Sequence, residues 1–178
     1  PDDIHYVETH GTGTPLGDAI EVGALRNVFG GLRSRPLVIG STKTNIGHIG
    51  VAAGAAGLLR ALFVVREGEV PPHLHCEVPS RAVREAGLQL NNSRQTMLLD
   101  VAGPRRAGVS SFGIGGTNAH VLLEAAPAAQ PRPIVDGPQL LVLSAKTERA
   151  LEGQVQRLQE HLALASPSLE DVAFTLQV

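Results

Sequence analysis

Aromatic residues are scarce in this chain of 178 residues, which contains no tryptophan, one tyrosine and four phenylalanines. It therefore offers few of the side chains on which nucleic-acid bases stack. An excess of positive charge is lacking too, because 15 basic and 17 acidic residues leave a net charge of −2. With no basic stripe in the sequence, we expect no nucleic-acid partner.

Cysteine and long hydrophobic runs are also rare. The single cysteine, Cys76, excludes a disulfide framework and favours a reducing compartment, so we expect a cytoplasmic protein. The most apolar stretch, residues 46–65, contains His48 and Arg60 and indicates a buried helix, not a membrane span. The first residues do not resemble a signal peptide. Since the chain lacks an initiator methionine and stops within a helical pattern, we expect it to be part of a longer protein.

Apolar residues make up 43% of the chain, enough for a buried core. In the first part, strand-like runs alternate with helical spacing. The elements that we expect are strands at residues 4–7 and 37–39, loops at 10–16 and 41–47, and helices at 18–29 and 51–66. Asp18 and Glu21 resemble a capping box at the start of the first helix. This order predicts an α/β fold, in which the loops leave the carboxyl ends of the strands.

The second part begins with an irregular stretch, residues 71–92. The pattern then predicts strands at residues 106–112, 119–124 and 140–143, a proline-rich linker at 127–139, and a helix whose apolar stripe is Leu151, Val155, Leu158, Leu162 and Ala165. Ser168 and Asp171 predict the cap of a last helix.

Reactive side chains concentrate in three loops. His10 lies in the first, Lys43 and His48 in the second, and the third is the glycine-rich stretch 110–118. Loops at the carboxyl ends of strands share one crevice in an open α/β sheet, so both histidines can act on one substrate. They would serve there as proton donors or as hydrogen-bond donors to an oxyanion. Taken alone, His10 is equally well explained as a structural loop histidine.

A nucleotide-binding loop is a poor explanation of the first of these loops. The glycines at positions 11, 13 and 17 have the wrong spacing for a dinucleotide fingerprint, and Pro15 interrupts them. A Walker-type Gly-Lys-Ser/Thr triplet does not occur in the sequence.

Three segments together carry a family resemblance. Residues 7–14 (Val-Glu-Thr-His-Gly-Thr-Gly-Thr), 43–48 (Lys-Thr-Asn-Ile-Gly-His) and 111–120 (Ser-Phe-Gly-Ile-Gly-Gly-Thr-Asn-Ala-His) resemble the three C-terminal motifs of β-ketoacyl synthases. Their order and spacing are most similar to the ketosynthase domains of modular polyketide synthases. The resemblance extends to about residue 126, and residues 140–178 resemble the linker subdomain that follows such domains.

The resemblance implies an α/β fold of the thiolase-like type, with five layers, αβαβα, built from two similar halves. Residues 1–126 would be the C-terminal portion of the ketosynthase domain, residues 127–139 the proline-rich linker, and residues 140–178 an incomplete linker subdomain. The partners implied are the N-terminal half of the domain, an acyl carrier protein and, for the whole domain, a second copy in a homodimer.

The activity implied is decarboxylative Claisen condensation. An acyl chain is held as a thioester on a cysteine, and a malonyl-type extender arrives on the phosphopantetheine arm of the carrier protein. His10 and His48 would assist decarboxylation and hold the enolate oxygen, and Lys43 would orient and polarise the site around His48. No bound cofactor or metal is implied.

Three further residues match the family's motifs. Thr12 and Thr14 match the hydroxyls that hold the phosphopantetheine arm, although they could equally be loop-shaping hydroxyls. Phe112 matches a gating aromatic whose backbone N–H contributes to an oxyanion hole, although it could equally be a core residue that closes a strand.

The sequence departs from the family's pattern in two places. The segment with the nucleophilic cysteine is absent, and Cys76 lies in a proline-bounded stretch outside the three loops, with no helix start to lower its pKa. With His73 and His75 it is too small a set for a metal site. Gly57 stands near the point where the fatty-acid branch of the family carries a glutamate that pairs with the lysine, so the partner of Lys43 is left open.

A second interpretation belongs to a different functional class. The chain would be a non-catalytic structural or interaction half of a split or proteolysed ketosynthase, inactive without the half that bears the cysteine. A third interpretation, a transacylase or a ketosynthase unable to condense, depends on that other half.

Overall fold

The computed structural model describes residues 1–31, 33–128 and 137–178. The chain divides into two compact units, Pro1–Ala128 and Ala129–Val178, which are described separately below. Residues 129–136, which form most of the expected proline-rich linker, lie outside the described residues.

A five-stranded sheet organises the first unit, in the order β4-β2-β1-β6-β7. The strands are β1 (Tyr6–Glu8), β2 (Leu37–Gly40), β4 (Leu88–Leu90), β6 (Arg106–Phe112) and β7 (Asn118–Glu124). The first four are parallel, and β7 pairs antiparallel to β6 through the hairpin that the sequence predicts. The parallel strands therefore deliver their following loops to one edge of the sheet.

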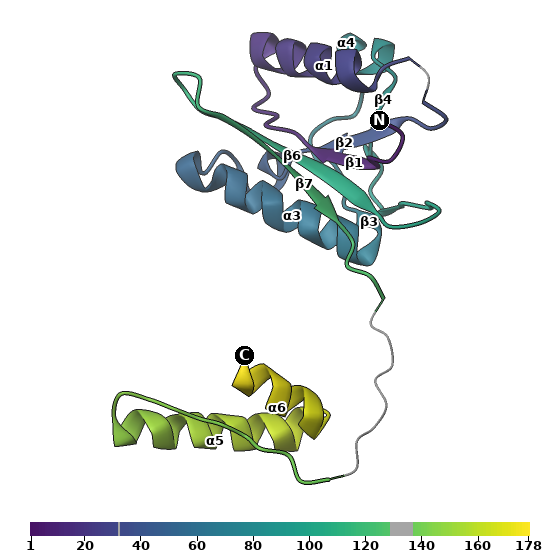
Figure 1. Ribbon diagram of the computed structural model, residues 1–178. Helices are drawn as coiled ribbons and strands as arrows, with labels where there is room; N and C mark the ends of the chain where they lie inside the picture. Colours follow the sequence, from purple (N-terminus) through teal and green to yellow (C-terminus); the bar gives the residue numbers. More distant parts are fainter. Residues whose placement is uncertain (32, 129–136) are drawn as a thin grey trace. The chain divides into compact units, whose positions relative to one another are not determined.

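Helices cover both faces of this sheet (Figure 1). On one face lie α1 (Pro15–Phe29) and α4 (Arg81–Glu85), and on the other lies α3 (Ala53–Glu67), which a short 3₁₀ turn, η1 (Gly50–Ala52), precedes. Side chains alternate along β1, so that Val7 faces α1 while Tyr6 faces α3. A small second sheet pairs β3 (Glu69–Val70) with β5 (Met97–Leu98).

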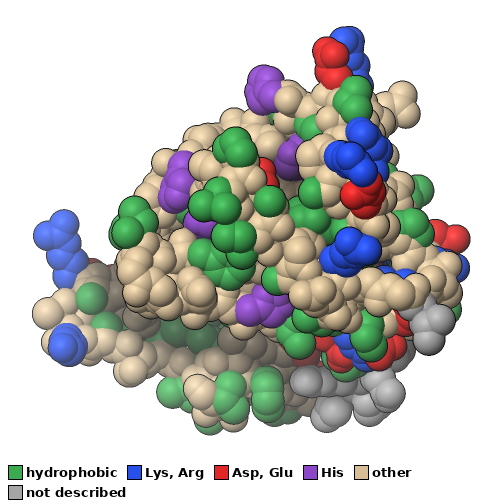
Figure 2. Space-filling view, turned by 90° about the horizontal axis from the view of Figure 1, so that it is seen from above, with side chains coloured by type: hydrophobic (Ala, Val, Ile, Leu, Met, Phe, Trp, Pro, Cys, Tyr) green, Lys and Arg blue, Asp and Glu red, His purple; other side chains and the backbone are tan. Residues whose placement is uncertain are grey.

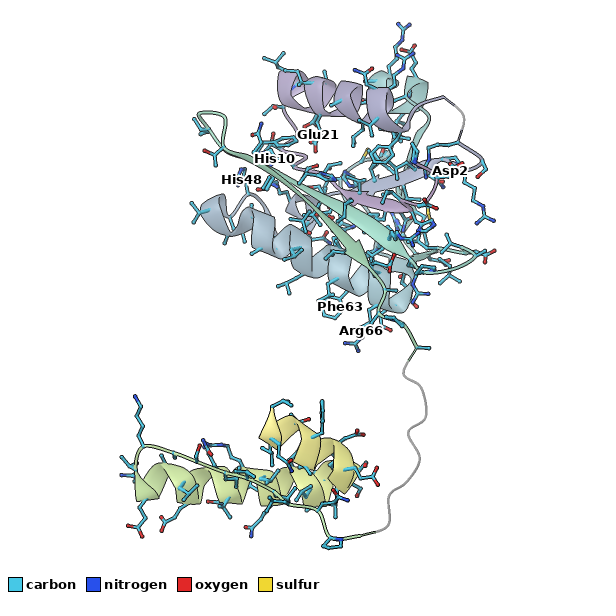
Figure 3. All side chains as sticks on the ribbon, in the orientation of Figure 1. Asp2, His10, Glu21, His48, Phe63 and Arg66 are labelled. Carbon is cyan, nitrogen blue, oxygen red and sulfur yellow. The ribbon has the colours of Figure 1, made fainter. Side chains whose placement is uncertain are left out.

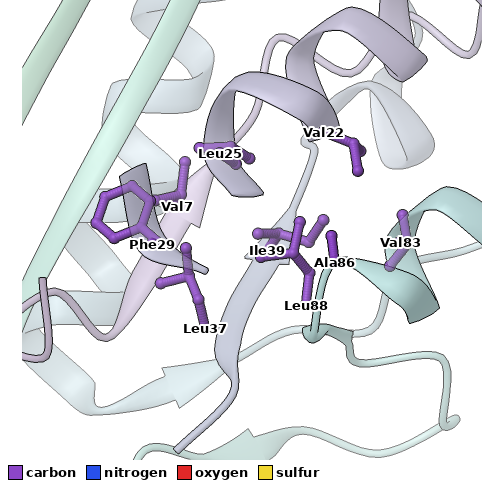
Figure 4. Packing of buried hydrophobic residues seen from close by; sticks show 9 residues of the cluster. All are labelled: Val7, Val22, Leu25, Phe29, Leu37, Ile39, Val83, Ala86 and Leu88. Carbon is purple, nitrogen blue, oxygen red and sulfur yellow. The ribbon is translucent and has the colours of Figure 1, made fainter. Parts of the chain in front are cut away.

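Two hydrophobic clusters fill the space between the sheet and its helices. The cluster under α1, shown in Figure 4, consists of Val7, Val22, Leu25, Phe29, Leu37, Ile39, Val83, Ala86 and Leu88. The cluster under α3 consists of Tyr6, Val38, Ala61, Val64, Val65, Val70, Ala107 and Val109. The loops at the carboxyl edge are thus anchored to packed elements on both faces.

The start of α1 differs from the expected capping box. The helix begins at Pro15, and the hydroxyl of Thr14 caps it by accepting a hydrogen bond from the backbone N–H of Gly17 at 3.2 Å. Proline suits this first position because its missing N–H would have no partner there. Asp18 instead accepts from the N–H of Gly13 at 3.1 Å, so the prediction of a cap at Asp18 was wrong.

Other short elements also differ from expectation. The loop expected at 41–47 contains a one-turn helix, α2 (Lys43–Ile46), and the irregular stretch 71–92 contains α4 and β4. The apolar run Leu140–Leu143 is not a strand, although one was expected. An apolar run alone does not make a strand, because the strand also needs a ladder partner.

In the second unit, residues 137–178 are described and form two helices, as expected, α5 (Glu148–Ala165) and α6 (Leu169–Gln177). Thr147 caps α5 by accepting from the N–H of Ala150 at 3.2 Å. The expected side-chain cap at Ser168 does not form. Every residue of α5 is described and none is fully buried, whereas α6 buries Ala173.

A membrane-crossing helix would need a long and strongly apolar segment. No helix in the described part of the chain meets that requirement.

Candidate active site

The loops that follow β1, β2 and β6 bring three of the expected residues together. The His10 and His48 rings lie 5.7 Å apart between centroids and are nearly perpendicular, at 87°. The Phe112 ring lies 5.4 Å from His10. Figure 3 shows both histidines beside the turn of the β6–β7 hairpin and the start of α3. The shared crevice expected from the sequence is therefore present.

Hydrogen bonds fix which nitrogen of each histidine carries the proton. The backbone N–H of Phe112 donates to Nδ1 of His10 at 3.4 Å, and the N–H of Gly50 donates to Nδ1 of His48 at 3.1 Å. A nitrogen that accepts a hydrogen bond carries no proton, so each neutral imidazole has its N–H at Nε2. Both rings are thereby set up as Nε2–H donors.

The pKa of His10 is lowered, first by burial and then by the electrostatic effects of Lys43 and His48. This keeps the His10 imidazole neutral at pH 7 and preserves the tautomer described above. His48 is exposed in this chain, whereas His10 is half-buried.

Gly11 allows the first loop to approach the end of β2 closely. Its φ is +45°, and a Cβ there would lie 2.7 Å from Oγ1 of Thr9 and 2.8 Å from Cβ of Ser41. Only glycine tolerates both this backbone conformation and this contact. The glycine therefore shapes the turn that follows His10.

Glu21 holds the backbone at His10. Its buried carboxylate accepts from the N–H of His10 at 2.8 Å and from the N–H of Gly11 at 3.0 Å. Burial raises the pKa of Glu21, while the two backbone hydrogen bonds lower it. The sequence pattern predicts only a helix cap for this residue. The missed signal is its place on the buried face of α1, four residues before Leu25 and eight before Phe29.

Lys43 is the first residue of α2, and its pKa is lowered by burial and raised by Glu8 and Glu21. Glu8 ends β1 and is buried, with an exposed fraction of 2%. The negative charge around Lys43 therefore comes from β1 and α1 and not from α3. Both carboxylates act on Lys43 through their charge, without a close ion pair among the described residues, and neither was a candidate site residue.

The structure gives Thr14 the helix-capping role already described, and its Oγ1 lies 3.3 Å from Oγ1 of Thr12. Phe112 is partly exposed at the end of β6, and its N–H is directed at His10. Binding of the phosphopantetheine arm by the two threonines and an oxyanion contact from Phe112 stay predictions.

A cavity of about 300 Å³ lies next to the loops. Gly11, Glu21 and Lys43 line one part of it, and the segment with His73 and Cys76 lines another. Cys76, which the sequence places outside the three loops, borders the same cavity as Lys43. Among the described residues, neither His10 nor His48 lines it, and no group of three His, Cys, Asp or Glu side chains could hold a metal.

A larger cavity of about 520 Å³ lies by the segments that lead into β1 and β2, and neither His10 nor His48 lines it. His5, Arg33 and Arg35 line it, and Arg33 donates to the carbonyl of Ile4 at 2.7 Å. Arg33 thereby holds the N-terminal segment in place.

Exposed apolar side chains mark two surfaces of the first unit. Leu16, Ile20 and Val28 are exposed on α1, and Figure 2, which looks onto this side, shows hydrophobic and histidine side chains together. The outer face of α3 exposes Leu59, Leu62 and Phe63, the last of which is labelled in Figure 3.

Two family models match the chain. The β-ketoacyl synthase C-terminal domain matches residues 1–77, and the ketoacyl-synthetase C-terminal extension matches residues 83–177. The extension thus begins before β4 and includes β6 and β7 as well as the second unit.

Curated relatives and solved structures agree with these matches. Erythronolide synthase EryA3 of Saccharopolyspora erythraea is 49% identical over 180 residues, which cover 98% of this chain and 6% of the relative. Spectinabilin polyketide synthase system protein NorA' of Streptomyces orinoci is 45% identical over 184 residues, which cover 99% of this chain and 5% of the relative.

Among solved structures, the ketosynthase from module 1 of the bacillaene synthase of Bacillus amyloliquefaciens FZB42 has a TM-score of 0.73 and 34% identity, over 100% of this chain and 33% of that one. The oxazolomycin ketosynthase domain OzmH KS7 of Streptomyces albus JA3453 has a TM-score of 0.68 and 30% identity, over 99% of this chain and 37% of that one.

The chain therefore spans about a third of these ketosynthase chains and a much smaller share of the curated synthases. The thiolase-like α/β fold that the sequence predicts is confirmed by these structural neighbours. With both family models and modular synthases as relatives, the chain belongs to the β-ketoacyl synthase family, as the C-terminal part of a ketosynthase domain of the modular polyketide synthase type.

Proposed function

We propose that this chain completes a ketosynthase that joins an acyl thioester to a malonyl-type extender by decarboxylative Claisen condensation. The observation that carries the proposal is the pair of imidazoles, His10 and His48, 5.7 Å apart and both set up as Nε2–H donors. Two neighbouring imidazole N–H donors suit an oxygen on which negative charge develops.

Decarboxylation breaks the bond between the extender's α-carbon and its carboxylate, and carbon dioxide leaves. The electron pair of that bond forms the enolate, whose oxygen accepts the two Nε2–H hydrogen bonds. The α-carbon then attacks the acyl thioester, a carbon–carbon bond forms, and the cysteine leaves as a thiolate. In this scheme Lys43 supplies a positive field beside the histidines, and Glu21 keeps the backbone of His10 in place.

The N–H of Phe112 has a second use in this scheme. It donates to His10 in this chain, so it orients the imidazole. To serve in an oxyanion hole it would have to leave Nδ1 of His10, and the swing of the partly exposed ring would accompany that change.

The nucleophilic cysteine comes, in our proposal, from the N-terminal half of the domain. The exposure of His48 supports this, because donors stabilise an enolate best where water is excluded, and the other half would cover them. The apolar outer face of α3 supports it as well, since Leu59, Leu62 and Phe63 would become buried.

The extender would arrive on the phosphopantetheine arm of an acyl carrier protein, held by Thr12 and Thr14. The whole domain would act as a homodimer in the cytoplasm, with no cofactor of its own.

Intact-mass measurement tests this division of labour. We expect the lone chain to form no acyl adduct with an acyl thioester, whereas the complete domain becomes acylated and condenses with malonyl carrier protein. Cys76→Ala in the complete domain should keep near-normal turnover, because Cys76 lies outside the three loops that carry His10, Lys43 and His48. A stable adduct on Cys76 that transfers to malonyl carrier protein would refute the proposal.

A further inference from the structure

Two opposite charges are buried under the catalytic loops. Glu8, at the end of β1, has an exposed fraction of 2%, and Arg60, in the middle of α3, has one of 9%. Oε2 of Glu8 lies 3.6 Å from Nε of Arg60. Burying such a pair costs desolvation energy, and an apolar pair would often be at least as stable, so a role other than stability is worth seeking.

The carboxylate of Glu8 holds the start of α2. Oε1 accepts from the backbone N–H of Thr42 at 2.5 Å and from its hydroxyl at 2.8 Å. Oε2 accepts from the hydroxyl of Tyr6 at 2.5 Å, and burial raises the pKa of Tyr6, so this donor keeps its proton. Thr42 immediately precedes Lys43, so Glu8 fixes the turn that presents the lysine.

Arg60, on α3, binds the same α2 segment. Its guanidinium donates to the carbonyl of Ser41 at 3.2 Å and to Oδ1 of Asn45 at 2.9 Å. A third hydrogen bond, at 3.1 Å, goes to the carbonyl of Pro71. Nε of Arg60 has no hydrogen-bond partner among the described residues and faces only the charge of Glu8. Glu8 and Arg60 therefore fix the backbone of residues 41–45 by hydrogen bonds, and His48 follows this segment three residues later.

Gly57 makes room for this carboxylate. A Cβ at position 57 would lie 3.0 Å from Cγ of Glu8 and 3.6 Å from its Oε1. The strand-borne side chain of Glu8 thus occupies the space into which a side chain from α3 would project. A carboxylate side chain at position 8 and one at position 57 would therefore occupy the same space.

We propose that Glu8 is a positioning residue of the ketosynthase reaction, whose carboxylate, paired with Arg60, supplies from β1 the negative charge beside Lys43 that α3 omits at Gly57. It touches no substrate in this scheme. It acts through Lys43 and the α2 turn, which keep His48 opposite His10. This inference rests on the proposed function and adds the source of the charge that the lysine needs.

The charge on Lys43 provides a readout that a purely structural role would not change. The charged or titratable groups around it are Glu8 from β1, Glu21 and Asp18 from α1, Arg60 from α3, His10 and His48 in the loops, and His73, His75 and Cys76 across the cavity. Glu8 raises the pKa of Lys43 against the effect of burial. Removing its charge therefore lowers that pKa, and the ammonium loses its proton at a lower pH.

The first test compares Glu8→Gln with Glu124→Gln in the complete cysteine-containing domain. Glu124 also pairs with an arginine, Arg106, but it lies exposed at the end of β7. For Glu8→Gln we expect acylation of the cysteine to persist, decarboxylation of malonyl carrier protein to fall on the order of 10²-fold, and the alkaline limb of the pH profile to move to lower pH. For Glu124→Gln we expect the wild-type profile.

The second test moves the carboxylate to the helix. Glu8→Ala empties the space and Gly57→Glu refills it from α3, so the double variant should recover at least about tenfold of the activity lost in Glu8→Ala. If Glu8→Gln does not fold, this swap decides the question, because recovery of folding and turnover supports the inference and a folded, inactive swap overturns it. An unchanged alkaline limb in Glu8→Gln also overturns it. A wild-type domain that does not condense would instead refute the proposed function.

Discussion

The interiors of the two units differ in what they bury. The first unit encloses two hydrophobic clusters and, at the carboxyl edge of its sheet, the buried charges of Glu8, Glu21 and Arg60. The second unit buries Ala173 but no residue of α5, all of which is described. A buried charge is tolerated only with a partner held in a fixed position. The partly buried apolar side chains of α5 are stabilised by the area they remove from water, whichever apolar groups they contact. Substitutions in the first unit should therefore change individual reaction steps, and those in the second should change stability alone.

The largest effect is expected at His48. In the complete domain, His48→Ala removes one enolate donor and should lower decarboxylation of malonyl carrier protein by about 10² to 10³-fold, while acylation of the cysteine continues. His120→Ala is the matched control, because Nδ1 of His120 pairs with the hydroxyl of Ser110 at 3.0 Å, on the sheet. Equal losses in the two variants would contradict the assignment of His48.

A smaller loss is expected at Glu21. Glu21→Gln keeps the shape of the side chain, but it replaces one of the two oxygens that accept from the His10 and Gly11 N–H groups by an NH2 donor. We expect a decrease of about tenfold in decarboxylation, the value of one hydrogen bond to a charged group. Asp18→Asn, which alters an exposed contact to Gly13, should change the rate little. A wild-type rate in Glu21→Gln would show that His10 does not depend on this carboxylate.

The pH profile should also report on His10. Because burial and Lys43 lower the pKa of His10, the acid limb of decarboxylation should lie below 6.5, the ordinary histidine value. Lys43→Met removes a positive charge that lowers the pKa of His10, so this pKa should rise. The acid limb of the residual activity should therefore move to higher pH. Rates measured between pH 5 and about 8 would test the sign, and an acid limb that moves to lower pH would contradict it.

The smallest effect on the reaction is expected in the second unit. Leu158 is half-buried on the stripe of α5, so Leu158→Asp should destabilise that unit by about 1–2 kcal/mol, less than for a fully buried leucine. Condensation should proceed at the wild-type rate. Limited proteolysis beside the exposed-site control Gln159→Asp would measure the change, and equal protease resistance would show that the stripe contributes nothing.

Helical and strand periodicity in the sequence predicted the elements that build the first unit's sheet and its covering helices. It missed α2 and β4, which span four and three residues, too few for a period to show. It also predicted a strand at Leu140–Leu143 that does not form, because an apolar run says nothing about a ladder partner. The local sequence pattern therefore fails to predict a strand where its formation depends on pairing with a distant segment.

In the candidate site, too, some residues could be predicted from local sequence and others depend on tertiary contacts. His10 and His48 could be paired from sequence because both follow parallel strands, whose ends meet at one edge. The roles of Glu8 and Glu21 could not, because they depend on contacts across the fold, Glu8 with Thr42 and Arg60, and Glu21 with the backbone of His10. The sequence signal for both is a glutamate at a buried position, within the strand β1 for Glu8 and on the buried face of α1 for Glu21.

Gly57 also constrains the order in which substitutions can accumulate in such a domain. A lineage that acquires Glu at position 57 first must fit a Cβ 3.0 Å from Cγ of Glu8, which overfills the space. A lineage that loses Glu8 first leaves Arg60 buried without its counter-charge. Each single substitution therefore gives a less stable protein, so we expect the residues at positions 8 and 57 to change together. Whether the carboxylate comes from β1 or from α3 should then be inherited and should separate branches of the family.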